Sequence, residues 1–156
     1  MYKIALIPGT FDPITTGHLH LIKHASERFD KVVVGIFINP NKNPMFTIES
    51  RKKAIEFATK DIPNVTVITN EGYVADYAKE NGISAIVKGF RNIDDYVYEK
   101  KMAIYNKEHS GVDTYLIESE KDYSQISSTM VRNQIIDKNT TPDGIPIGIL
   151  DILEQN

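Results

Sequence analysis

The sequence predicts a single α/β domain with a doubly wound, five-stranded parallel sheet in the strand order 3-2-1-4-5. Short runs rich in β-branched residues alternate with helical patterns, which favours right-handed βαβ units and helices on both faces of the sheet. No change of composition, repeat or linker divides the 156 residues. The apolar fraction of 41% and the charged fraction of 25% are ordinary for a globular protein. We therefore expect residues 1–156 to form one Rossmann-like domain.

The predicted strands are short apolar runs that end at turn residues. They cover residues 3–8, 31–38, 64–69, 84–88 and 113–117. The first ends at Pro8 and Gly9, and the second runs into a segment rich in proline and asparagine. Runs this rich in valine and isoleucine are typical of a parallel sheet that is covered on both faces.

The predicted helices lie between these strands and after the last one. They cover residues 17–29, 47–59, 74–81, 93–108, 127–136 and about 147–154. Thr47 is a natural N-cap for the second helix. In the fourth helix, one face at helical spacing is formed by Ile93, Tyr96, Val97 and Ile104. The polar stretch 137–144 predicts the loop before the final helix.

Composition excludes several classes of function. The net charge of −3, from 18 Lys and Arg against 21 Asp and Glu, gives no support for nucleic-acid binding. The absence of cysteine excludes disulfides, thiolate metal sites and cysteine nucleophiles, and it fits a cytoplasmic location. The first apolar run ends at Pro8, and no run approaches 18 apolar residues, so we expect no membrane association.

The segment between the first predicted strand and the first helix carries the most informative pattern in the chain. It reads Gly9-Thr10-Phe11-Asp12-Pro13-Ile14-Thr15-Thr16-Gly17-His18. Backbone N–H groups at a helix N-terminus attract an anion, and His18 is placed beside them. The segment is neither of the common Gly-rich phosphate loops. Taken alone, it also fits an ordinary strand–turn–helix junction with an exposed His18.

Other candidate residues also follow predicted strands, and ligands of open α/β sheets bind beyond the strands' carboxyl ends. Lys42 lies in the loop after the second strand, where it is either solvated or neutralises a phosphate. Lys88, Gly89 and Arg91 follow the fourth strand. Gly89 lets the backbone approach a ligand closely, and Arg91 can hold phosphate oxygens in bidentate fashion. If strands one and four flank the switch point, their loops face each other across one crevice.

Ser127, Ser128 and Thr129 place three hydroxyls at the start of the fifth helix. One of them is enough for capping, so the run indicates a second anion site built with the free N–H groups. Asp94 and Asp95 are interpreted as part of a solvated helix face.

His20 and His24 have the spacing of a helical metal pair, but no cysteine or third histidine lies nearby. We therefore expect both to be surface residues, and we predict no metal site made of protein side chains.

Residues 9–18 resemble the Gly-Thr-Phe-Asp-Pro-x-x-x-Gly-His signature of the nucleotidyltransferases. With Lys42-Asn43-Pro44-Met45-Phe46-Thr47, residues 89–99 and residues 123–129, nearly the whole chain resembles the phosphopantetheine adenylyltransferases. Thr15 stands where mononucleotide adenylyltransferases and cytidylyltransferases usually have a second histidine. Three positions depart from the usual family residues: Lys88 for Arg, Phe90 for Leu, and Thr129 for Ser.

The resemblance implies transfer of AMP from ATP to 4′-phosphopantetheine, which gives dephospho-coenzyme A and pyrophosphate in coenzyme A biosynthesis. It implies Mg²⁺ bound with ATP, a homohexamer, and coenzyme A as a feedback ligand. The implied catalytic residues are His18, Lys42 and Arg91. The implied phosphopantetheine-binding residues are Thr10, Lys42, Val74 and Lys88. The implied ATP-binding residues are Thr10, Phe11, His18, Gly89, Phe90, Arg91, Glu99, Tyr123, Ser124, Gln125, Ile126, Ser127, Ser128 and Thr129.

Two alternatives stay open at this point. The acceptor could be another compound, such as nicotinate or nicotinamide mononucleotide. The protein could also be a nucleotide-binding sensor that does not turn ATP over. Thr10, His18, Lys42 and Arg91 together argue against the sensor, because binding alone would not need cations on both sides of the crevice.

Overall fold

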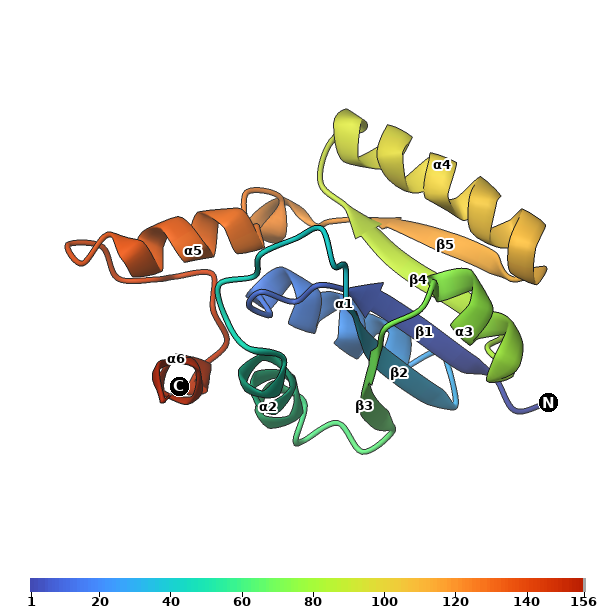
Figure 1. Ribbon diagram of the computed structural model, residues 1–156, viewed down its shortest axis with the longest axis horizontal. Helices are drawn as coiled ribbons and strands as arrows, with labels where there is room; N and C mark the ends of the chain where they lie inside the picture. Colours follow the sequence, from blue (N-terminus) through green and yellow to red (C-terminus); the bar gives the residue numbers. More distant parts are fainter. Residues whose placement is uncertain (156) are drawn as a thin grey trace.

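The computed structural model describes residues 1–155 and has a five-stranded parallel sheet in the order β3-β2-β1-β4-β5, as predicted (Figure 1). All neighbouring strands pair in parallel. The strands are β1 (Ile4–Gly9), β2 (Lys31–Phe37), β3 (Val65–Asn70), β4 (Ala85–Phe90) and β5 (Asp113–Glu118). Each strand lies within two residues of its predicted bounds.

The helices are α1 (Thr16–Ser26), α2 (Ile48–Ala58), α3 (Val74–Glu80), α4 (Ile93–Ser110), α5 (Ser128–Ile136) and α6 (Ile149–Glu154), with a 3₁₀ turn η1 (Lys121–Tyr123). Helix α1 ends three residues before its predicted end, and the side-chain amide of Asn64 donates to the carbonyls of Ser26 and Phe29 there. Helix α6 begins two residues late because Gly148, at its N-cap, has a left-handed φ of 88°.

The sheet separates two apolar layers. Side chains of β1 alternate between them, so that Ala5 and Ile7 face one cluster and Leu6 faces the other. The first cluster includes residues of α1, α2 and α6, and the second includes residues of α3. Helix α4 packs against α3, β4 and β5 (Figure 1).

This arrangement puts the topological switch point between β1 and β4, because the connections after β1 and β2 run on one face and those after β3 and β4 on the other. Ligand sites are expected beyond the carboxyl ends of these two strands. In the described part of the chain, no helix combines the length and apolarity needed to span a membrane.

Candidate active site

A cleft of about 800 Å³ opens at the carboxyl ends of β1 and β4. Its walls come from the segments that follow β1, β2, β4 and β5. It brings together these predicted site residues: Thr10, Phe11, His18, Lys42, Lys88, Gly89, Arg91, Glu99, Tyr123, Ile126, Ser127, Ser128 and Thr129. A second cavity, of about 280 Å³, lies beside the end of α1 and contains none of them.

His18 is held at the floor of the cleft by the cap of α1. Thr15 is the N-cap, and its hydroxyl oxygen accepts a hydrogen bond from the His18 N–H at 3.2 Å. In return, the Thr15 N–H donates to His18 Nδ1 at 3.0 Å. This is a capping box in which histidine replaces the usual Glu or Gln. The ring of Phe11, itself only 2% exposed, contacts the imidazole edge-on at a centroid distance of 4.9 Å.

The cap also selects the tautomer of His18. Because a backbone N–H points at Nδ1, that nitrogen acts as an acceptor, so the proton of the neutral ring lies on Nε2. Burial, together with the positive charges of Lys88 and Arg91, lowers the pKa of His18 to about 4. At neutral pH the side chain is therefore an uncharged ring with one N–H left to donate.

We expect an NMR titration of the free protein to find His18 as the Nε2–H tautomer with a pKa near 4. The sign follows from linkage: between pH 6.5 and 4 the unfolded chain binds a proton at His18 that the native protein does not bind. The contribution of His18 to the free energy of unfolding should thus be level above pH 6.5 and fall as the pH drops towards 4. Long-range ¹H–¹⁵N spectra, assigned with a variant lacking His18, measure both properties. An Nδ1–H tautomer or a normal pKa would contradict this description.

Two of the cations in the cleft are paired with carboxylates of α4. Lys88 Nζ lies 3.0 Å from Glu99 Oε2, and Arg91 Nε lies 3.2 Å from Asp95 Oδ2. The interpretation of Asp95 as part of a solvated face was wrong, since it also accepts a hydrogen bond from the Arg91 N–H. An anionic substrate entering here would compete with these carboxylates for the cations.

Lys42 differs from these cations in its surroundings. It lies in the loop between β2 and α2, is exposed, and lines the cleft. Across the described residues, its ammonium group has no hydrogen bond or ion pair to another side chain. Its charge is therefore available to an entering anion.

The three hydroxyls at the start of α5 each have a partner in the protein. Ser127 caps the helix by accepting from the Met130 N–H at 3.0 Å. Ser128 donates to the carbonyl of Pro13 at 2.9 Å, and Thr129 accepts from Arg132 Nη2 at 3.1 Å. Ser128 thus attaches α5 to the turn that precedes α1 and His18, so at least one of the three hydroxyls serves a purpose other than capping. The first N–H groups of α5 lie at a helix N-terminus, a place that favours an anion.

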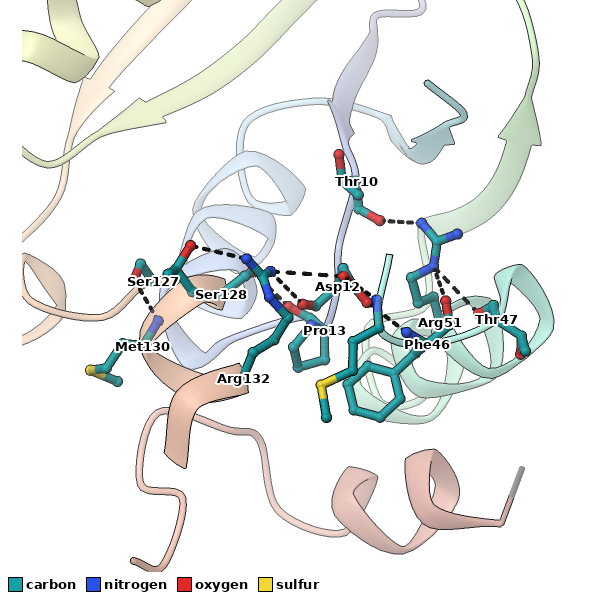
Figure 2. Close-up of polar contacts among 12 residues, drawn as sticks. Thr10, Asp12, Pro13, Phe46, Thr47, Arg51, Ser127, Ser128, Met130 and Arg132 are labelled. Carbon is teal, nitrogen blue, oxygen red and sulfur yellow. Dashed lines mark hydrogen bonds and ion pairs between the residues drawn. The ribbon is translucent and has the colours of Figure 1, made fainter. Parts of the chain in front are cut away.

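Asp12 joins the turn after β1 to the loop after β2 (Figure 2). Its side chain is only 6% exposed, and its two oxygens accept from the N–H groups of Met45 at 2.8 Å and Phe46 at 2.9 Å. Arg132 Nη1 donates to the Asp12 carbonyl at 2.9 Å and lies 3.8 Å from its carboxylate. On the other side, Arg51 Nη1 donates to the carbonyl of Thr10 at 2.9 Å.

Sequence reasoning missed both arginines. Arg132 lies three residues after Thr129 on α5 and lines the cleft, so its helical spacing from the hydroxyl run was a usable signal. Arg51 stands next to Lys52 and Lys53 in α2, and nothing in the sequence marks it as the buried member of that basic run.

Four predicted site residues do not line the cleft: Val74, Phe90, Ser124 and Gln125. Val74 begins α3 and packs against the apolar cluster on the other face of the sheet, because an apolar side chain there is better buried than exposed. Phe90 contacts Tyr96 with a centroid distance of 5.0 Å. The Ser124 hydroxyl donates to the carbonyl of Lys121.

His20 is more than a plain surface residue. Its ring stacks on Tyr123 with a centroid distance of 4.5 Å, and its Nε2 lies 3.3 Å from Glu120 Oε1. Both His20 and His24 lie along the cleft. Within residues 1–155, no group of three or more His, Cys, Asp or Glu side chains is arranged to hold a metal ion.

Comparison with known proteins identifies the family of the chain. The family described as cytidylyltransferase-like matches residues 6–134. A phosphopantetheine adenylyltransferase of Clostridium tetani is 46% identical over 131 residues, which cover 83% of this chain and 82% of that protein. A phosphopantetheine adenylyltransferase of Symbiobacterium thermophilum is 43% identical over 129 residues, covering 82% and 80%. The chain belongs to the phosphopantetheine adenylyltransferase family.

A solved structure extends the comparison to the fold. It is a bifunctional NMN adenylyltransferase/ADP ribose pyrophosphatase of Francisella tularensis, complexed with AMP and a Mn ion. Its TM-score is 0.66 at 23% identity, and the match covers 93% of this chain but only 44% of that protein. The phosphopantetheine adenylyltransferase family and this more distant enzyme therefore share the architecture described above.

Proposed function

We propose that the protein transfers AMP from ATP to the 4′-phosphate of phosphopantetheine, with dephospho-coenzyme A and pyrophosphate as products. The observation that carries the proposal is the neutral His18, whose Nε2–H is the ring's free donor in a cleft lined by cations. Lys42 comes from the segment after β2, and Lys88 and Arg91 come from β4 and the segment after it. Two polyanions can thus be held side by side at the switch point.

The reaction needs positioning and charge stabilisation more than acid–base chemistry. An oxygen of the acceptor phosphate attacks the α-phosphorus of ATP, and the bond from that phosphorus to the oxygen bridging to the β-phosphate breaks. The electron pair leaves with pyrophosphate. Because the attacking oxygen is already anionic, no general base is required. The work of the protein is to align the two phosphates and to stabilise the charge that builds up on the α-phosphate.

The resemblance to the family divides these groups between the two substrates. His18 Nε2–H donates to the α-phosphate, and Thr10 with Lys42 positions the acceptor phosphate. Arg91 and the first turn of α5 hold the triphosphate. Glu99 and Tyr123 help to enclose the nucleotide. Lys88 keeps the positive charge of the usual arginine, but as a point charge without a bidentate fork.

The residues fit a divalent cation that arrives with the nucleotide. The cleft offers cations for phosphate oxygens, and Mg²⁺ bound to a nucleotide is held mainly by phosphates and water. When bound, the ion would neutralise part of the triphosphate charge. Asp95 and Glu99, which pair with Arg91 and Lys88, are the carboxylates of α4 that line the cleft and would face the ion's water ligands.

Thr15 supports phosphopantetheine over a mononucleotide as acceptor. In this chain position 15 is buried and serves as the N-cap that orients His18, so it offers no second imidazole to the cleft. The relatives at 43% and 46% identity support the same acceptor.

Several finer features form part of the proposal. We place the protein in the cytoplasm, which the cysteine-free composition accommodates. We propose a homohexamer, supported by the apolar side chains that α4 exposes on one face: Ile93, Val97 and Ile104. Coenzyme A contains the same adenylyl and phosphopantetheine parts as the product, dephospho-coenzyme A. We propose it as the feedback ligand that binds in the cleft.

A panel assay tests the function. The protein is mixed with Mg²⁺, a nucleotide (ATP or CTP) and one acceptor (phosphopantetheine, nicotinamide mononucleotide or glycerol phosphate), and pyrophosphate is measured. We expect release with ATP and phosphopantetheine, at a rate at least tenfold above any other pair. Preference for another acceptor would replace the proposed substrate, and no release in any mixture would favour a sensor.

A further inference from the structure

Arg51 is a buried cation in α2, outside the segments that we propose to bind phosphate. It lies in the first turns of α2 and is 3% exposed. Its Nε donates to the carbonyl of Phe46 at 3.0 Å, with a longer contact to Thr47 at 3.4 Å. Its Nη1 donates to the carbonyl of Thr10 at 2.9 Å (Figure 2). One planar guanidinium therefore bridges the turn after β1 and the end of the loop after β2.

Stability alone does not account for such a group. Burial lowers the pKa of Arg51, and only the nearby negative charge of Asp12 opposes that effect. A buried cation is expensive to desolvate, and apolar side chains of similar volume often stabilise a fold as well or better. What an apolar side chain cannot do is hold two backbone carbonyls in a fixed relative position.

Both bridged segments carry groups proposed to hold the acceptor phosphate. Thr10 itself lines the cleft, and the loop that ends at Phe46 carries Lys42. Asp12 grips the same end of the loop through the N–H groups of Met45 and Phe46. Within the described residues the Lys42 side chain has no partner, and its N–H donates to the Asn39 carbonyl of the same loop, so the anchored end at Phe46 limits where the loop can place Lys42.

Arg132 forms a natural comparison on the opposite side of Asp12. It donates to the Asp12 carbonyl and to the Thr129 hydroxyl, and it lines the cleft beside the first turn of α5. Within the described residues, Arg132 makes no direct hydrogen bond or ion pair to the loop that carries Lys42. Arg51 thus binds the end of this loop directly, whereas Arg132 reaches it only through Asp12 and also contacts the start of α5.

We propose that Arg51 is a positioning residue, which fixes Thr10 and Lys42 relative to each other for the acceptor phosphate. This inference rests on the proposed function, because it assigns Thr10 and Lys42 to the acceptor. Arg51 acts only through those two groups and does not contact substrate.

The test compares Arg51→Lys with Arg51→Met in steady-state kinetics and in binding of ATP alone. Lysine keeps the charge but cannot span both carbonyls with a rigid fork. We expect kcat/KM for phosphopantetheine to fall about 10- to 100-fold in Arg51→Lys, mainly through KM, because a misplacement of about 1 Å can cost that much. The Kd for ATP should change by less than about twofold. In Arg51→Met we expect a larger fall in kcat/KM for phosphopantetheine, again with little change in the Kd for ATP.

Two matched arginines serve as controls. Arg28→Lys, at an exposed position outside the cleft, should change neither constant. Arg132→Lys should weaken ATP more than phosphopantetheine. Thermal unfolding of every variant shows how much stability each loses.

The outcomes separate this inference from the proposed function. Equal losses for both substrates in Arg51→Lys, or unchanged kinetics with only a lower Tm, would overturn the positioning role. If Arg51→Met does not fold, Arg51→Lys decides alone. A wild-type protein that releases no pyrophosphate with phosphopantetheine overturns the proposed function instead, before any variant is compared.

Discussion

His18→Ala is expected to lower kcat by on the order of 10²–10³-fold or more, which is the usual cost of deleting one preorganised donor at a developing charge. The structure supplies the preorganisation: the Thr15 N–H occupies Nδ1, and Phe11 supports the ring. The neutral ring donates one hydrogen bond from Nε2. This bond strengthens as negative charge builds up on the α-phosphate, so it stabilises the transition state more than the bound substrates. Pyrophosphate release under saturating substrates measures the effect.

His109→Ala is the matched control, because this histidine stacks on Tyr105 near the end of α4 and lies outside the cleft. It should keep full turnover. His18→Ala should keep its fold and much of its ATP affinity, with a modest fall in Tm from the weakened capping box. Near-normal turnover in His18→Ala would sink the role given to this residue.

Asp12→Ala is expected to reduce the free energy of unfolding by about 3–5 kcal/mol, the range for removing one member of a buried charged network. The substitution leaves the N–H groups of Met45 and Phe46 without their acceptor. It also removes the negative charge that faces Arg132 at 3.8 Å and that favours the charged form of Arg51. Denaturant unfolding, with the slope compared between variants, measures the loss.

Asp12→Asn separates the two causes. An amide oxygen can still accept one backbone N–H, but the charge is gone, so a smaller loss of about 1–3 kcal/mol is expected. Asp30→Ala is the exposed counterpart, since Asp30 also accepts a backbone N–H, from Lys3, but near solvent. It should cost about 1 kcal/mol. If Asp12→Ala cost no more than Asp30→Ala, Asp12 would not be the buried link between the two loops that the structure describes.

The parallel sheet and the helix starts were predictable because local sequence patterns indicate them. Thr47 and Ser127 are short hydroxyl side chains placed directly before helical patterns, and both are caps in the structure. The alternation of short buried runs with helical patterns indicates right-handed connections and a parallel sheet, and the order 3-2-1-4-5 is the one expected for a Rossmann-like domain. These features depend on residues close in sequence or on a rule of handedness.

The end of α1 and the buried contacts of Arg51 were not predictable because they depend on residues far apart in the sequence. The end of α1 is bound by Asn64, which lies 38 residues after Ser26. Arg51 reaches a carbonyl 41 residues away, and only the folded chain distinguishes it from its basic neighbours. Val74 has the right place after a strand, but its apolar side chain packs into the core.

The attachment of α5 to the turn after β1 determines when the cleft can exist during synthesis of the chain. The bond from Ser128 to Pro13 spans 115 residues, and the bond from Arg132 to Asp12 spans 120. A nascent chain that has completed all five strands still lacks these partners. The sheet can therefore form first, but the wall of the cleft made by the start of α5 closes only after residues 128–132 have been synthesised.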